Sequence, residues 1–198
     1  MLAKAKRGRP AEKDRRENIL DAALQCFVER GFYGTTIPEI ATQASIASGT
    51  IYHYFDSKEA LVNALFRHWK GHISQRVLAA FPQGATSREQ FRTMWHEIIG
   101  FAMAEPTAFA FIELHKHTSY LDAESKAIDG TTKTFAHMMI QRAQIEGVVK
   151  PLDTWVLMEL IFGAFVGMMR ASYEGRVQLT EETIAGAEQA CWDAISIH

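Results

Sequence analysis

The sequence predicts an all-α protein, and three observations lead to this fold class. Apolar residues recur at three- and four-residue spacing along most of the 198 residues, which is typical of amphipathic helices. Prolines and glycines stand where such helices would begin or end. No segment alternates apolar and polar residues long enough to indicate a strand. An apolar fraction of 47% gives a chain of this length a real hydrophobic core.

The first two expected helices have clear ends. A single apolar face runs through residues 15–30, and Gly31 then stops the helix. The next helix is short and begins with a Thr-x-x-Glu capping box, formed by Thr36 and Glu39. Pro38 suits the first turn of that helix, because its fixed backbone and missing N–H are tolerated there.

A second short helix and a long helix follow. A turn at residues 45–47 leads into the short helix, which we expect over residues 48–54. Asp56 and Ser57 then provide another cap, and a long amphipathic helix runs from there to about residue 80. Further helices are expected over residues 87–104, 106–118, 122–146, 152–174 and 180–197.

Basic charge is concentrated at the N-terminus, although the whole chain has a net charge of −2. Residues 1–16 carry seven Lys or Arg against two acidic side chains, whereas the remaining 182 residues hold 14 basic and 21 acidic ones. A basic arm on an acidic body indicates local contact with a polyanion, and a solvated, disordered tail is the alternative. We therefore divide the chain into a basic flexible arm, residues 1–14, and two domains, residues 15–60 and 61–198.

The sequence does not predict export or membrane insertion. The N-terminus has no apolar core of the signal-peptide type. The longest apolar stretch, residues 155–169, contains Glu159 and is too short to span a bilayer. Cys26 and Cys191 lie far apart in helical patterns and are expected to be free thiols. Together these features predict a cytoplasmic protein with no membrane contact.

A dense aromatic cluster follows the two short helices. Residues 52–55 read Tyr-His-Tyr-Phe, and so many rings in one helical turn are hard to bury together. Two short helices joined by a tight turn are the pattern of a helix-turn-helix, whose second helix reads the major groove of DNA. Ile51 and Phe55 are expected to point inward, and the outward rings are expected to face DNA.

The residues around this cluster suit contact with DNA. Gly49 has no side chain and allows close backbone approach. Ser48 and Thr50 offer small hydroxyls to phosphates or base edges, and His53 offers a ring nitrogen. Lys58, near the start of the long helix, can reach a phosphate.

Residues 15–61 resemble the DNA-binding domain of the TetR family of bacterial transcription regulators. The matching residues keep the family's spacing throughout: Ile19, Leu20, Ala22, Ala23, Phe27, Gly31, Phe32, Thr35, Thr36, Ile40, Ala41, Ala44, Gly49, Ile51, Tyr52, Tyr54, Phe55, Ser57, Lys58, Glu59 and Leu61. The rest of the chain matches in helical character, in length and in the break from Gly147 to Pro151. In this family that region is a variable ligand-binding and dimerisation domain.

The resemblance implies a role for the matching residues. Phosphate contacts would come from Thr36, Tyr52, Tyr54 and Lys58, and contacts to bases or the adjacent backbone from Ser48, Gly49, Thr50 and His53. An arm holding Arg7 and Arg9 suits an A·T-rich minor groove. Two positions depart from the family pattern, since Ser45 replaces a common turn glycine and Ala47 a common capping serine. A cap supplied by Ser48 is the alternative, and it would compete with the base-reading role of that residue.

The C-terminal region is expected to bind a ligand. Helices rich in aromatic residues and Met suit an adaptable apolar pocket, although ordinary core packing is the alternative for any one side chain. We expect an effector cavity lined by some of Trp95, Ile99, Phe111, His115, Met138 and Phe162. In this cavity the histidine would orient a polar group on a mostly apolar effector.

A dimer interface is expected on the last two helices. Gly163, Gly167 and Ala171 recur at four-residue steps, and such a stripe of small residues allows close helix packing. Cys191 and Trp192 on the final helix would complete the interface. The resemblance implies a four-helix bundle made by two chains, and packing within one chain is the alternative.

No metal, cofactor or catalytic site is expected. His115 and His117 are two residues apart and cannot share one helix face, and no Cys or carboxylate completes a site at ligand spacing. There is no nucleophile–base pair or phosphate loop, so an enzyme is not expected. Taken with the resemblance, the sequence predicts a homodimeric transcriptional repressor that leaves a palindromic DNA operator when a small, mostly apolar effector binds. A DNA-binding scaffold or regulator without an effector is the alternative.

Overall fold

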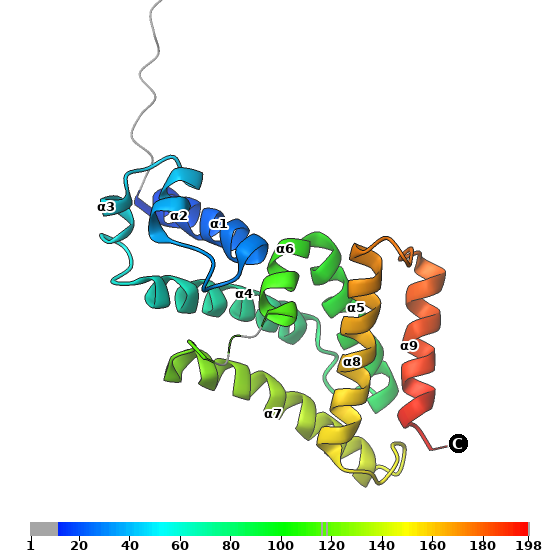
Figure 1. Ribbon diagram of the computed structural model, residues 1–198. Helices are drawn as coiled ribbons and strands as arrows, with labels where there is room; N and C mark the ends of the chain where they lie inside the picture. Colours follow the sequence, from blue (N-terminus) through cyan, green and yellow to red (C-terminus); the bar gives the residue numbers. More distant parts are fainter. Residues whose placement is uncertain (1–11, 116, 118, 198) are drawn as a thin grey trace, which may run out of the picture. The chain divides into compact units, whose positions relative to one another are not determined.

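The computed structural model describes residues 12–115, 117 and 119–197 (Figure 1). In this part of the chain the regular structure is helical, apart from one antiparallel bridge between Val149 and Ser196, so the all-α prediction is confirmed. Residues 1–11 of the basic arm, which include Arg7 and Arg9, lie outside the described residues. The last residues assigned to the arm, 12–14, are helical, so the first helix begins earlier than predicted.

The chain divides into two compact units, residues 1–66 and 67–198. The division falls within α4, Lys58–Ala80, a short way beyond the expected boundary at residue 60. The first turns of α4 carry buried apolar side chains that belong to unit 1, including Leu61 and Leu65. This explains why the boundary lies inside a helix rather than at its start.

Unit 1 contains α1, Glu12–Arg30, α2, Ile37–Gln43, and α3, Ser48–Ile51, besides the first part of α4. α1 ends at Gly31, whose positive φ of 69° suits a residue without a side chain. The most deeply buried side chains come from all four helices and form the core of the unit; they include Ile19, Ala23, Ile40, Ile51 and Leu61.

Unit 2 contains the second part of α4, four further long helices and two short helical segments (Figure 1). They are α5, Ser87–Ala104; α6, Pro106–Phe109; the π-helical turn η1, Ala110–Leu114; α7, Ala123–Ile145; α8, Thr154–Tyr173; and α9, Glu181–Ile195. The helix expected over residues 106–118 is shorter than predicted, because the backbone turns extended at His115 (φ −101°, ψ 146°). The longer helices begin at capping side chains: Thr86, Asp122, Asp153 and Thr180.

In unit 2, α5 contacts α7 and α9. The helix α8 contacts the same two helices. One buried cluster joins Ala143, Val149, Leu157 and Ile195. Arg88 on α5 pairs with the buried carboxylate of Glu188 on α9, with 2.9 Å between the Arg88 Nη2 and Glu188 Oε2 atoms. The packing of α5, α7, α8 and α9 leaves the cavity described below.

Candidate nucleic-acid interface and ligand cavity

The turn between α2 and α3 is closed by hydrogen bonds to the end of α2. The backbone N–H of Ile46 donates to the carbonyl of Ala41 over 2.9 Å, and the side-chain amide of Asn18 on α1 donates to the carbonyl of Ala44 over 2.9 Å. Ser45, which lies between Ala44 and Ile46 in this turn, has a positive φ of 56°. A serine therefore occupies the left-handed conformation that glycine adopts at lower energy.

α3 begins without a side-chain cap. Its N-cap is Ala47, which has an extended backbone, and Ser48 is the first helical residue. The alternative in which Ser48 caps α3 is therefore wrong. Backbone hydrogen bonds from His53 to Thr50 (3.2 Å) and from Phe55 to the carbonyl of Ile51 (3.0 Å) continue the turn beyond the helix.

The aromatic cluster is divided between the core and the surface, as the sequence predicts. Ile51 and Phe55 are buried, which confirms that they point inward. Tyr52 is 54% exposed, His53 is also exposed, and Tyr54 is half-buried. Together with the three residues before Ile51, these outward residues form what we call the reading surface: Ser48, Gly49, Thr50, Tyr52, His53 and Tyr54.

Gly49 lies on the reading surface and has no structural reason within the chain to be glycine. Its φ is not in the left-handed region, and a Cβ atom built at this position would meet nothing within 4 Å. Glycine also weakens a helix relative to alanine. The missing side chain thus leaves open space on the outside of α3, as a closely approaching partner requires.

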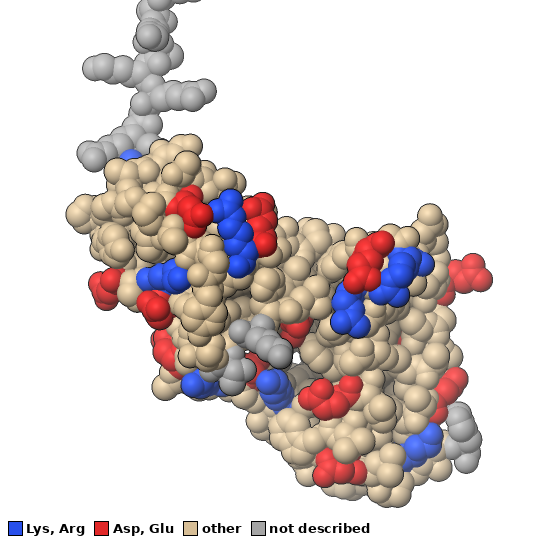
Figure 2. All heavy atoms as spheres, viewed as in Figure 1, with Lys and Arg blue, Asp and Glu red and all other residues tan. Residues whose placement is uncertain are grey.

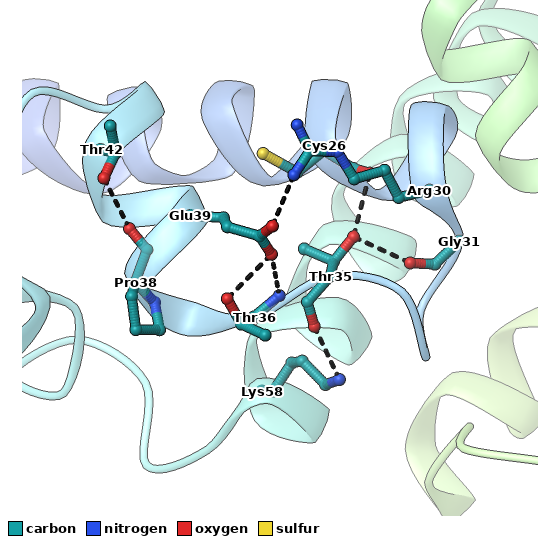
Figure 3. A network of polar contacts seen from close by, with 9 residues as sticks. All are labelled: Cys26, Arg30, Gly31, Thr35, Thr36, Pro38, Glu39, Thr42 and Lys58. Atoms are coloured by element: carbon teal, nitrogen blue, oxygen red, sulfur yellow. Dashed lines mark hydrogen bonds and ion pairs between the residues drawn. The ribbon is translucent and has the colours of Figure 1, made fainter.

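Thr36 takes part in a polar network with α1 and α2 (Figure 3). The carboxylate of Glu39 accepts hydrogen bonds from the hydroxyl and from the backbone N–H of Thr36, both over 2.8 Å. The same carboxylate forms an ion pair with the guanidinium of Arg30 over 2.6 Å. These hydrogen bonds from Thr36, together with Arg30, lower the pKa of Glu39. The hydroxyl proton of Thr36 is held within the chain, and its phosphate contact stays a prediction.

Lys58 ties the start of α4 to the turn after α1. Its ammonium donates to the carbonyl of Thr35 over 2.8 Å (Figure 3). It also donates to the carbonyl of Phe32 over 2.9 Å and lies 4.3 Å from the centre of the Phe32 ring. The buried hydroxyl of Thr35 lies 3.0 Å from the carbonyl of Cys26 and 2.8 Å from that of Gly31. Sequence reasoning missed this structural role of Lys58, and its phosphate contact also stays a prediction.

Unit 1 carries little positive charge outside the arm. Residues 14–66 hold the four basic side chains Arg15, Arg16, Arg30 and Lys58 against seven acidic ones. Two of these cations have partners in the chain already described, and the guanidinium of Arg16 lies 5.3 Å from the centre of the Phe55 ring. Figure 2 shows acidic and basic side chains interspersed over the described residues of the face in view.

A cavity of about 140 Å³ lies within unit 2. Its lining comes mainly from α5, α7, α8 and α9, and the residues are Ser87, Gln90, Phe91, Met94, Trp95, Ile98, Ala136, Met139, Ile140, Ala143, Val149, Met158, Ile161, Phe162, Phe165, Trp192 and Ile195. Every one of these side chains is uncharged at neutral pH, and most are apolar. The cavity thus suits a small apolar ligand.

The cavity is lined by part of the predicted set of ligand-binding residues. Trp95 and Phe162 line it, whereas Ile99, Phe111, His115 and Met138 do not. Ile99 and Phe111 are buried elsewhere, His115 follows the π-helical turn, and Met138 is 59% exposed while its neighbour Met139 faces the cavity. The aromatic and Met residues of the sequence indicate that these helices are apolar. They do not indicate which face of each helix borders the cavity.

A buried ionic cluster links α4, η1 and α7. The ammonium of Lys70 lies 2.8 Å from a carboxylate oxygen of Glu113 and 3.2 Å from one of Asp129, which also pairs with Lys133 over 2.6 Å. Burial opposes the charge on Lys70, but the two carboxylates outweigh burial and raise the pKa of the ammonium. The cluster thus holds a charged lysine inside unit 2.

His117 is buried beside η1. Its Nε2 faces the carbonyl of Phe111 and therefore carries the proton, while Nδ1 accepts from the hydroxyl of Tyr120 over 2.8 Å. Burial lowers the pKa of His117 to about 4. Among the described residues, no group of three His, Cys, Asp or Glu could hold a metal ion.

α8 exposes an apolar face. It has 20 residues and an 18-residue window of mean hydropathy 1.4, so by length and composition alone it could cross a membrane. The helix extends beyond the apolar stretch of residues 155–169, which corrects the prediction that this segment is too short. Val156, Leu160 and Gly163 lie exposed on one side of the helix.

The residues predicted for a dimer interface differ in exposure within the single chain. Gly163 is exposed, Gly167 is half-buried and Ala171 is buried within the chain. Cys191 is partly buried, and burial raises its pKa. Trp192 lines the cavity and lies 5.3 Å from Phe91 between ring centres, so it packs inside the chain. The predicted roles of Ala171 and Trp192 in the interface therefore find no support in their positions.

Comparison with known proteins agrees with this arrangement. The family described as "Bacterial regulatory proteins, tetR family" matches residues 19–65, and that described as "Tetracyclin repressor-like, C-terminal domain" matches residues 66–197. The fatty acid metabolism regulator protein of Bacillus subtilis (strain 168) is 25% identical over 148 residues, which cover 73% of this chain and 76% of that protein. The HTH-type transcriptional repressor KstR2 of Rhodococcus jostii (strain RHA1) is 39% identical over 74 residues, which cover 37% of this chain and 36% of that protein.

A solved structure shares the fold over nearly the whole chain. A TetR family transcription regulator from Marinobacter aquaeolei VT8 matches with a TM-score of 0.84 and 24% identity, over 94% of this chain and 98% of that chain. The two family matches extend from residue 19 to residue 197 and include the reading surface and the cavity. The chain therefore belongs to the TetR family of transcription regulators, with an N-terminal helix-turn-helix DNA-binding domain and a C-terminal helical domain.

Proposed function

We propose that this protein is a cytoplasmic, homodimeric transcriptional repressor that binds a near-palindromic DNA operator and releases it when a small, mostly apolar effector binds. The reading surface is the observation that carries the proposal. It exposes Tyr52 and His53 beside the open space at Gly49. Exposed rings and an open backbone on the second helix of a helix-turn-helix suit entry into the major groove.

The cavity in unit 2 supports the effector part of the proposal. An apolar cavity inside a helical domain is a ready site for a small molecule. A ligand that prefers one conformation of the dimer shifts the population toward it and, by linkage, lowers the affinity for DNA. The alternative is a regulator without an effector, and a cavity filled by side chains would have favoured that alternative.

The exposed apolar face of α8 supports the homodimer. Val156, Leu160 and Gly163 share that face, and their burial against a second copy would remove apolar surface from water. A two-fold dimer also presents two reading surfaces to two half-sites of a palindrome.

A nuclease footprint with purified protein tests the DNA-binding part. The DNA is the region upstream of the protein's own gene, and random duplexes subjected to selection extend the search. We expect protection of a near-palindrome. Failure to protect or select any sequence, at low and at physiological salt, would contradict the proposal.

Matched variants then locate the interface. His53→Ala should weaken operator binding about tenfold, because a good base contact contributes about 1–3 kcal/mol. His96→Ala, which changes an exposed histidine of unit 2, should leave the affinity unchanged. Equal effects of the two substitutions would argue against the reading surface.

The arm is tested by deletion of residues 1–13. The deletion removes five basic side chains and should flatten the dependence of affinity on salt concentration, because fewer counterions are released on binding. An unchanged slope would show that the arm makes no phosphate contacts.

A further inference from the structure

The two polar aliphatic side chains of the cavity lining donate their hydrogen bonds to groups outside it. The hydroxyl of Ser87 donates to the carboxylate of Glu146 over 2.6 Å, and the side-chain amide of Gln90 donates to the carbonyl of Pro82 over 3.4 Å. Neither Glu146 nor Pro82 belongs to the lining. Both hydrogen bonds are therefore used up outside the space that a ligand would fill.

Two indoles are the other polar groups of the lining. The Nε1 atom of Trp95 is buried, so a ligand meets the carbon atoms of that ring rather than its N–H. Trp192 borders both the cavity and a polar pocket of about 340 Å³. Its ring centre lies 5.3 Å from that of Phe91 and 5.2 Å from the guanidinium carbon of Arg88. A substitution of Trp192 is included in the experiment below to test whether its N–H binds a ligand.

The charged groups beside the cavity neutralise one another. The polar pocket shares two residues of its lining with the cavity and includes Arg88 and Arg142. Arg88 binds the carboxylate of Glu188 over 2.9 Å, and the Nε atom of Arg142 lies 2.8 Å from the carboxylate of Glu146. A charged ligand in the cavity would thus lose its hydration without gaining a free counter-ion, and burial of an uncompensated charge is costly.

The volume and the flexibility of the lining suit a single ring. An apolar cavity of about 150 Å³ engineered in another protein stays dry and binds benzene. The cavity here has a similar volume, about 140 Å³. Met94 on α5, Met139 on α7 and Met158 on α8 line it, and the flexible, polarisable side chain of Met adapts to the shape of an apolar ligand and contacts aromatic rings favourably.

We propose that the cavity binds a hydrocarbon of about one ring, uncharged and without a hydrogen-bonding group, such as a monocyclic arene. The inference rests on the proposed effector-binding role of the cavity and restricts the effector to a class that is recognised by shape and dispersion contacts. A hydroxylated or carboxylated derivative of the same ring is rejected, because its polar group loses hydration and gains no partner.

Five probes separate charge, polarity and size. Toluene, benzyl alcohol, benzoate and benzylammonium each have one ring, and 1-methylnaphthalene has two. Each probe is titrated into the full chain labelled with ¹³C on the methyl groups of its eight Met residues. The signals are assigned by single Met→Leu substitutions, and a bound aromatic ring shifts the methyl signals that it contacts.

We expect toluene to shift the signals of Met94, Met139 and Met158. The signals of Met103 and Met138, which are exposed and do not belong to the lining, should stay in place and serve as the internal control.

The order of affinities then tests the class of ligand. Benzyl alcohol, benzoate and benzylammonium should each bind at least about tenfold more weakly than toluene. In an open groove the second ring of 1-methylnaphthalene would strengthen binding by roughly tenfold or more, whereas in this cavity it should bind more weakly than toluene. The ratio of the affinities for toluene and benzyl alcohol should be the same in Trp192→Phe as in the wild type.

Several results would overturn the inference. These are shifts at Met103 and Met138 instead of the lining residues, no shift with toluene up to its solubility limit, or a charged probe that binds as tightly as toluene. Equal binding of toluene and benzyl alcohol, or a ratio that changes several-fold in Trp192→Phe, would show that the ligand forms a hydrogen bond. Tighter binding of 1-methylnaphthalene would refute the size limit. If Trp192→Phe does not fold, the five affinities of the wild type still decide. The experiment contains no DNA, so its failure is distinct from a failure of operator binding.

Discussion

Lys70 offers a sharp test of the buried ionic cluster. The side chains of Lys70 and Glu113 are 9% and 12% exposed, so the pair is largely withdrawn from water. Replacement of Lys70 by Met keeps an unbranched, flexible side chain but leaves Glu113 buried without its cation. The loss of one partner from a buried pair costs about 3–5 kcal/mol, mainly through the charge left behind. Because Asp129 keeps its ion pair with Lys133, we expect the lower end, about 3 kcal/mol.

Urea unfolding followed by circular dichroism measures this loss. Wild type and variants are compared at one protein concentration, because dimerisation would make the midpoint depend on concentration. With a slope of about 2–3 kcal/mol per molar urea, a loss of 3 kcal/mol lowers the midpoint by roughly 1 M or more. The matched control is Lys133→Met, whose side chain is 54% exposed and which should cost less than about 1 kcal/mol.

A double variant separates charge from packing. Lys70→Met combined with Glu113→Gln removes the uncompensated carboxylate while Asp129 remains paired, so most of the lost stability should return. A single variant that loses under about 1 kcal/mol would refute the reasoning, since such a value is typical of an exposed pair. If the double variant is no more stable than Lys70→Met, the lost free energy of unfolding comes from packing rather than from the uncompensated charge.

Three further substitutions test separate features. The pKa of His117 in the folded protein, about 4, lies below the ordinary value of 6.5. The contribution of the neutral imidazole to the free energy of unfolding is therefore complete above pH 6.5 and is lost as the pH falls toward 4. His117→Gln should remove about 2 kcal/mol of the stability difference between pH 7 and pH 5 in thermal melts, and parallel pH profiles would contradict this. Ser45→Gly should raise the unfolding free energy by about 0.5–1 kcal/mol, because it relieves the positive φ, and a loss of stability would show that the turn is not strained. Leu160→Glu should yield a monomer in analytical ultracentrifugation, whereas Leu78→Glu on α4, a leucine of similar exposure, should leave the dimer intact. A dimeric Leu160→Glu variant would place the interface elsewhere.

Much of unit 1 follows from its sequence, because the signals there are local. The capping pair Thr36 and Glu39 marks the start of α2, and the outward and inward aromatic residues follow from helical spacing. The contacts of Lys58 do not follow, because its carbonyl partners lie 23 and 26 residues earlier in the chain. A lysine near a helix start predicts a surface cation, and only the folded turn shows that backbone carbonyls bind it.

The environment of individual side chains in unit 2 is harder to predict from the sequence, because its helices are apolar on more than one side. The periodicity predicts where α7 and α8 lie, but an apolar residue on such a helix can face the core, the cavity or solvent. Met138 and Met139 illustrate this, since one is exposed and the other lines the cavity. Ala171 likewise fits a small-residue stripe but is already covered by its own chain.

The small number of basic side chains in residues 14–66 has a consequence for the search along a genome. Arg30 and Lys58 are held by groups of the chain itself, and residues 14–66 carry more negative than positive charge. Affinity for arbitrary DNA arises almost entirely from phosphates, and a genome offers a vast excess of arbitrary sites. Residues 14–66 would therefore add little to that affinity, and the time spent on unrelated sequence would depend mainly on the five basic side chains of residues 1–13.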